Sequence, residues 1–212
     1  CLLTIIVYFF FLEIKLDSFK AFLFSISFSI LAYTISGTPF VDLHATFFLL
    51  IATLFIIKNL KRQNNYLWIL IIFIIFLSFL SKQVPITYAV ISYFIILLYF
   101  FIKKKEFNTI LVIFISTITF LILFFIILQI NQISINDFYI QYFDYPRSIG
   151  SMRLNNFDFL NNIFFNKYKF IIIPTCILLF IKIKKKNVSF EETISYLIFL
   201  SFTIILIFHQ LM

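Results

Sequence analysis

The feature that most constrains this chain is a succession of long apolar stretches separated by short clusters of lysine and arginine. Several stretches approach 20 residues, the length that an α-helix needs to cross the apolar core of a bilayer. Charged residues make up only 12% of the chain, whereas a soluble domain carries about 25%. The mean hydropathy is +1.09. The sequence therefore predicts an all-α, polytopic bundle of transmembrane helices.

About eight helices are expected from the apolar stretches and their charged borders. They cover residues 1–12, 21–36, 41–57, 66–81, 86–102, 107–130, 170–183 and 194–212. The long polar interruption at residues 131–169 is expected to be an extracytoplasmic loop with short amphipathic helices. We expect residues 1–212 to form a single transmembrane domain. Because both ends lie within apolar stretches, we interpret the chain as an internal fragment of a longer protein.

The basic clusters predict how the helices are oriented. The linkers at residues 13–20, 58–65, 103–106 and 182–193 hold 12 of the 17 lysines and arginines. Alternating helices place these linkers on one side of the membrane, and cytoplasmic loops are enriched in basic residues. The interpretation is a multi-pass protein of the bacterial plasma membrane. The basic clusters orient helices and contact anionic lipid, so no nucleic-acid partner is expected.

Ionisable residues also gather on the predicted outer face. Asp42 and His44 stand where the helix at residues 41–57 begins, after Pro39. If the chain is extended here, residues two apart share a face, and a carboxylate with an imidazole can bind a divalent metal ion or a sugar-phosphate partner. If a helix has already begun, Asp42 lies in its first turn and is stabilised by the helix dipole. The sequence leaves both alternatives open.

Further candidate binding residues lie on the same outer face. Lys82 and Gln83 follow the helix at residues 66–81, where an ammonium suits a lipid phosphate or simply snorkels to the membrane surface. Tyrosine rings can stack on a sugar or lie in the interfacial belt. Aspartate and arginine can bind sugar hydroxyls and phosphate, since arginine matches phosphate oxygens. Candidates of these kinds in the 131–169 loop are Tyr142, Asp144, Tyr145, Arg147 and Arg153.

These outer-face residues carry a resemblance to a known family. Residues 37–44 read GTPFVDLH, and an apolar helix, a basic turn, a Trp-containing helix and FLSKQ at 79–83 follow. This order resembles the C-type (GT-C) glycosyltransferase superfamily, and more narrowly the dolichyl-phosphate-mannose-protein mannosyltransferase-like and aminoarabinose-transferase-like proteins. The resemblance implies transfer of a sugar from a polyprenyl-phosphate donor to an acceptor at the extracytoplasmic face, usually with inversion.

The resemblance also implies roles for single residues. Asp42 is expected to be catalytic, or to form with His44 a second acidic or metal-binding pair. The main catalytic acid of the family commonly lies in a first external loop, which we expect to precede this chain. The alternative function is a transporter or flippase of lipid-linked glycans, or another non-catalytic membrane protein. Transporters place ionisable residues at mid-bilayer, and the helix centres here contain none, which favours the enzyme.

Overall fold

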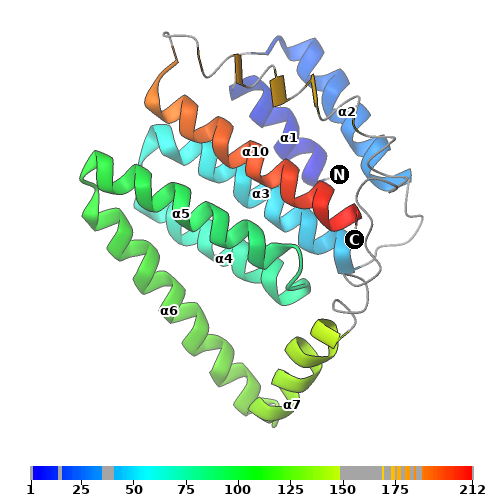
Figure 1. The fold of residues 1–212 in the computed structure, drawn as a ribbon, viewed down its shortest axis with the longest axis vertical. Coiled ribbons are helices and arrows are strands. Elements are labelled where there is room, and N and C mark those ends of the chain that lie inside the picture. The colour runs from blue at the N-terminus through cyan, green and yellow to red at the C-terminus, as the bar shows by residue number, and fades with distance from the viewer. Residues whose placement is uncertain are drawn as a thin grey trace.

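The computed structural model describes residues 2–13, 16–34, 41–148 and 188–211, together with isolated positions between 169 and 184. All regular structure within these ranges is helical (Figure 1). The elements are α1 (Leu2–Glu13), α2 (Ser18–Thr34), α3 (Val41–Arg62), α4 (Asn65–Ser81), α5 (Ile86–Lys104), α6 (Phe107–Ile130), α7 (Ile135–Tyr139), the π-helix η1 (Ile140–Asp144) and α10 (Phe190–Leu211). The all-α prediction is confirmed for this part of the chain.

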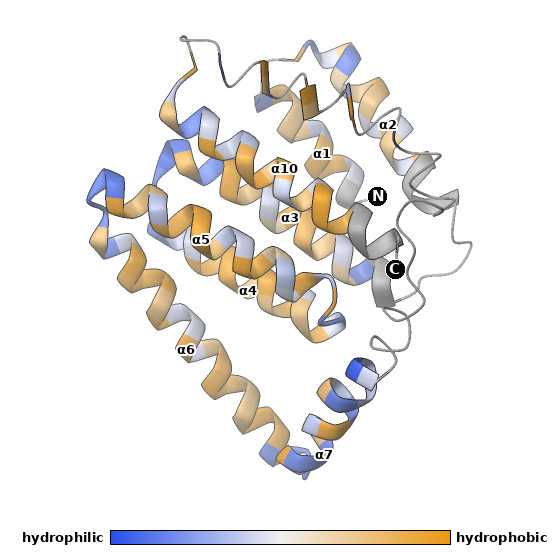
Figure 2. Cartoon of the chain, viewed as in Figure 1, coloured by the Kyte–Doolittle hydropathy of each residue, from blue (hydrophilic) through white to orange (hydrophobic). Residues whose placement is uncertain are grey.

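Three of the described helices are long and apolar enough to cross a membrane: His44–Arg62 within α3, Ile86–Lys104 and Phe107–Ile130. Figure 2 shows apolar residues along these helices and hydrophilic residues near their ends. Helix α6 exposes large apolar side chains such as Leu111, Phe114 and Ile122. Soluble proteins rarely expose contiguous apolar surfaces of this extent. The helices therefore fit a membrane protein, while a total of about eight spans stays a prediction.

The core lies where α3, α4, α5 and α10 pack together. Helix α3 packs most extensively against α4, and α10 contacts both α3 and α5 (Figure 1). Trp68 of α4 meets Phe101 of α5 edge-on, with 5.3 Å between ring centroids. A buried hydrogen bond of 2.6 Å joins the hydroxyls of Thr53 on α3 and Tyr93 on α5. Such polar bonds between apolar helices help to select one packing register.

The turn between α3 and α4 is shorter than the predicted linker at residues 58–65. Helix α3 continues to Arg62, so Lys58 lies within the helix. The reason is Asn59, whose fully buried side chain donates to the Asn64 carbonyl and accepts from the Asn64 N–H, both at 2.9 Å. Gln63 adopts a positive φ of 52°. These bonds satisfy backbone groups at the helix ends and close the hairpin within two residues.

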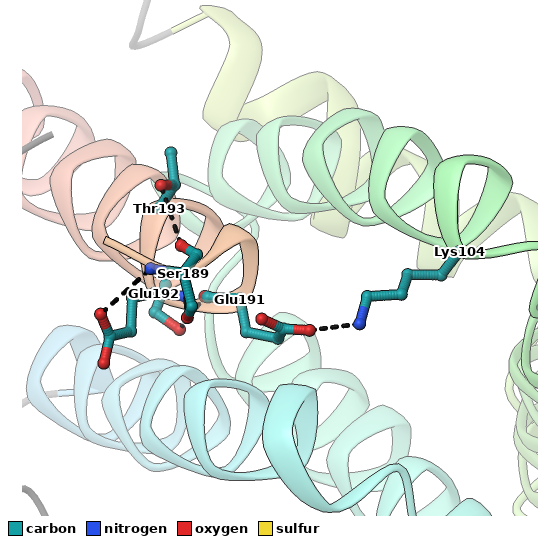
Figure 3. A network of polar contacts seen from close by, with 6 residues as sticks. Lys104, Ser189, Glu191, Glu192 and Thr193 are labelled. Atoms are coloured by element: carbon teal, nitrogen blue, oxygen red, sulfur yellow. Dashed lines mark hydrogen bonds and ion pairs between the residues drawn. The ribbon is translucent and has the colours of Figure 1, made fainter. Parts of the chain in front are cut away.

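Ion pairs bring the basic linkers to one end of the bundle. Glu13 at the end of α1 pairs with Lys58 and Arg62 of α3, each at 3.0 Å. Lys104 at the end of α5 pairs with Glu191 at the start of α10 (Figure 3). We call this the lysine-rich end. That these linkers lie at one end agrees with the alternating helix directions predicted from the sequence. The side of the membrane that the lysine-rich end faces stays a prediction.

Helix α10 begins earlier than the predicted residue 194, because a capping box starts it. The Glu192 N–H donates to the Ser189 hydroxyl at 3.2 Å, and the Ser189 N–H donates to the Glu192 carboxylate at 3.4 Å (Figure 3). This reciprocal pair satisfies two backbone donors that a helix start otherwise leaves without partners. The predicted helix at 170–183 lies mostly outside the described residues.

The ion pair at the start of α10 makes stability depend on pH. The hydrogen bond from Lys104 holds the pKa of Glu191 below its usual value. A carboxyl group whose pKa is lower in the folded state than in the unfolded state stabilises the fold at pH values above its unfolded pKa. This stabilisation is lost as the pH falls through the folded-state pKa. We therefore expect acidification from about pH 7 to about pH 3 to lower the thermal midpoint less in Lys104→Gln than in the parent, measured by circular dichroism in detergent.

Lys103→Gln is the matched control for this measurement. The Lys103 ammonium lies 4.3 Å from the Phe190 ring centroid and donates to an aromatic face rather than to a carboxylate. The thermal midpoint of Lys103→Gln should therefore fall on acidification by as much as that of the parent. Identical acid dependence in Lys104→Gln and in the parent would contradict the assigned role of the pair.

Candidate functional site

The candidate site lies at the end of the bundle opposite the lysine-rich end, where α3 begins and α4 ends. The Ser78 hydroxyl of α4 donates to the Ala45 carbonyl of α3 at 2.6 Å, and both residues are fully buried. His44 directly precedes Ala45, and Lys82 follows Ser78 by about one helical turn. The structure therefore places His44 and Lys82 at the same end of the α3–α4 hairpin.

The backbone around Lys82 and Gln83 is held by hydrogen bonds from both flanking helices. Lys82 caps α4 in an extended conformation, and its N–H donates to the Ser78 carbonyl at 3.2 Å. The Gln83 carbonyl accepts from the N–H and hydroxyl of Thr87 at 2.7 and 2.9 Å. The Val84–Pro85 peptide bond is cis. The partly exposed side chains of Lys82 and Gln83 thus extend from a well-supported turn.

Tyr142 attaches η1 to this turn. Its hydroxyl donates to the carbonyl of Phe79, one of the last carbonyls of α4, which have few partners within the helix. Its ring stacks on Phe138 with 4.8 Å between centroids and meets Phe79 edge-on at 5.8 Å. Burial raises the pKa of Tyr142 to about 12.

These contacts change how Tyr142 is interpreted. The sequence predicted that its ring stacks on a sugar or lies in the interfacial belt. In the structure Phe138 covers one face of the ring, and the hydroxyl is committed to α4. Tyr142 therefore positions η1 against the end of α4, and direct contact with a substrate stays a prediction.

The other predicted binding residues of this segment lie further along it. Asp144, Tyr145 and Arg147 are exposed, and the Tyr145 carbonyl accepts from the Ser148 hydroxyl at 2.8 Å. The side chains of these three residues are therefore accessible to a ligand. Arg153 lies outside the described residues.

The extended conformation considered for Asp42 and His44 is wrong. Both residues belong to α3, which begins at Val41. Pro39 disfavours helix only at the residue before it and does not prevent a helix from starting two residues later. Residues two apart on a helix lie about 200° apart around its axis and do not face each other. The helical alternative for Asp42, at the start of α3, therefore holds.

A metal centre also has no further support among the described residues. They contain no group of three or more His, Cys, Asp or Glu positioned to hold a metal ion. A divalent ion at Asp42 would need ligands from another segment, because a carboxylate alone leaves most of its coordination positions to other groups. A divalent metal ion held by Asp42 and His44 stays a prediction.

The sequence did not identify the residues that assemble this end of the bundle. Ser78 carried a weak signal, since a serine inside an apolar helix often bonds to a neighbouring helix. Phe79 and Phe138 carried none, because the chain contains 34 phenylalanines and their periodicity does not distinguish them. Only the tertiary structure shows that these three residues connect α3, α4, α7 and η1.

The chain matches no protein-family model, no curated protein and no solved structure.

Proposed function

We propose that this protein is a membrane glycosyltransferase that moves a sugar from a polyprenyl-phosphate donor to an acceptor at the extracytoplasmic face. The observation that carries the proposal is the assembly of the α3 start, the α4 end and η1 at one end of the bundle. The opposite end holds the basic clusters. A polyprenyl-phosphate keeps its chain in the bilayer and its phosphate at the surface, within reach of groups at helix ends.

Within this proposal the residues have different roles. Lys82 is the cation expected to bind the donor phosphate, since an ammonium at a helix end attracts anions. Asp42, the second residue of α3, supplies a negative charge that acts on groups whose own charge changes during transfer. The exposed Asp144, Tyr145 and Arg147 are candidates for binding the sugar or the acceptor.

The direct test is transfer of a radiolabelled sugar. Membranes that contain the protein are incubated with a polyprenyl-phosphate-linked sugar, and with the same sugar linked to a nucleotide. We expect label to leave the polyprenyl-phosphate donor only in membranes that contain the protein. Absence of transfer from a panel of polyprenyl-phosphate sugars, with the protein shown to be folded, would contradict the proposed function.

The proposal also makes a prediction about sidedness. With the native cysteines replaced by serine, a cysteine introduced at the exposed Ser148 should react in intact cells with a membrane-impermeant thiol reagent. A cysteine at Asn108, beside the lysine-rich end, should react only after the membrane is permeabilised. Labelling of Asn108→Cys alone in intact cells would reverse the orientation and place the candidate site in the cytoplasm.

A further inference from the structure

A cavity of about 370 Å³ lies at the lysine-rich end, far along the bundle from the candidate site. It is formed where the α3–α4 turn meets the α5–α6 turn, and its lining residues are Gln63, Asn65, Lys105, Glu106, Phe107, Asn108 and Thr109. Its volume lies within the range of roughly 300–1,000 Å³ typical of small-molecule sites. Apart from one phenylalanine, every lining side chain is polar or charged.

The start of α6 leaves hydrogen-bond donors at this cavity. Glu106 stands at the N-cap of α6 without capping it through its side chain. Thr109 and Ile110 donate their N–H groups to the Glu106 carbonyl, whereas Phe107 and Asn108 have no backbone partner within the described part of the chain. The first N–H groups of a helix bind anions, and phosphate in particular.

Thr109 provides a second observation that points to a ligand. It is only 6% exposed and lines the cavity. Among the hydrogen bonds of the described residues, its hydroxyl takes part in none. The residue is buried while its hydroxyl has no protein partner there, so the hydroxyl is available to bond a ligand in the cavity.

The charges around the cavity suggest what that ligand carries. Lys105 adds a positive charge beside the α6 N–H groups, which together suit a phosphate. Glu106 adds a carboxylate, and Gln63 and Asn65 add amide oxygens, which together suit an ammonium group. A single ligand with a phosphate and an ammonium group would bind both the positive groups and the oxygen atoms around the cavity. A simple anion would be repelled by Glu106.

We propose that this cavity binds the headgroup of a phospholipid that combines a phosphate diester with a primary ammonium group. The helices that border the cavity support this choice of occupant. Helices α5 and α6 qualify as membrane spans, and their connection contains the cavity. The adjacent Tyr66 and Phe107 are strongly exposed, as is usual for aromatic residues at a membrane surface. The proposal is independent of the transferase activity.

The test is a binding titration of purified, delipidated protein, with bound lipid counted by native mass spectrometry. Short-chain phosphatidylethanolamine should bind with one equivalent. Phosphatidylglycerol, which lacks the ammonium, and phosphatidylcholine, whose ammonium donates no hydrogen bonds, should bind at least about fivefold more weakly. Equal affinity for the three lipids would overturn the proposal. Competition by inorganic phosphate at equal concentration would also overturn it, in favour of a free-phosphate site.

Variants distinguish the cavity from general attraction at the lysine-rich end. Lys105→Gln and Thr109→Val should each raise the Kd for phosphatidylethanolamine about tenfold, whereas Thr109→Ser, which keeps the hydroxyl, should retain the parent affinity. Lys61→Gln is the control, since Lys61 is exposed in the last turn of α3 and outside the cavity lining. Parent affinity in Thr109→Val, or an equal loss in Lys61→Gln, would refute the site.

Discussion

Asp42→Asn is expected to lower the turnover of sugar transfer by about 10²-fold, the largest effect on activity that we predict. Asparagine keeps the size and polarity of aspartate and removes its charge. At a membrane surface with little water, that charge acts strongly on groups whose own charge changes during transfer. The measurement is the rate of label transfer from the polyprenyl-phosphate donor, at equal protein level and saturating donor.

Asp137→Asn provides a matched control for Asp42→Asn. Asp137 also lies in the first turn of a helix, α7, where its N–H and carboxylate bond to the Ser134 hydroxyl at 3.0 and 2.7 Å. Its replacement removes the same charge from the same end of the bundle and should leave turnover near that of the parent. If Asp42→Asn also retains parental turnover, Asp42 is a helix-start residue stabilised by the dipole.

Lys82→Gln should change a different kinetic constant. Loss of a phosphate contact that is made equally in the ground and transition states raises KM for the donor and changes kcat little. The backbone of Lys82 already caps α4 through its N–H, and glutamine preserves that bond. A fall in kcat as large as that of Asp42→Asn, with KM unchanged, would contradict the assignment of Lys82 to donor binding.

Trp68→Ala is expected to lower the free energy of unfolding by about 3–5 kcal/mol, the largest effect on stability that we predict. Trp68 is 1% exposed and packs edge-on against Phe101 in the centre of the α3–α4–α5–α10 core. Truncation leaves a cavity that the surrounding helices fill only in part. Because Trp68 is the only tryptophan, unfolding should be followed by far-UV circular dichroism rather than by fluorescence.

Trp68→Phe separates packing from hydrogen bonding at the same position. The Trp68 Nε1 is buried and has no hydrogen-bond partner among the described residues. Removing an unpaired buried donor recovers part of its desolvation cost, which offsets some of the lost volume. We expect a loss of at most about 1.5 kcal/mol. Losses of equal size in the Phe and Ala variants would show that the indole N–H has a partner.

The sequence alone determined the helical class and the order of the segments. A long apolar stretch that forms a helix satisfies all of its backbone groups internally, even in a membrane. Helices α4, α5 and α6 begin and end close to the predicted residues, whereas α3 begins at the predicted residue and continues past the predicted end to Arg62. The basic clusters predicted which linkers meet at one end, and the ion pairs of Glu13 with Lys58 and of Lys104 with Glu191 agree. Local composition suffices for both predictions, because each helix is recognised from its own apolar residues and each linker from its own basic residues.

Only the tertiary structure decided which side chains meet. Contacts such as Ser78 with Ala45 and Tyr142 with Phe79 join residues 33 and 63 positions apart, and no local pattern encodes such a distance. The continuation of α3 past Lys58 depends on the buried Asn59, which bonds across the turn to Asn64. The start of α3 at Val41 likewise decided against an extended Asp42–His44 pair. The first two contacts depend on packing between segments far apart in the sequence, whereas Asn59 bonds to a residue nearby in the chain and takes this role because its side chain is fully buried.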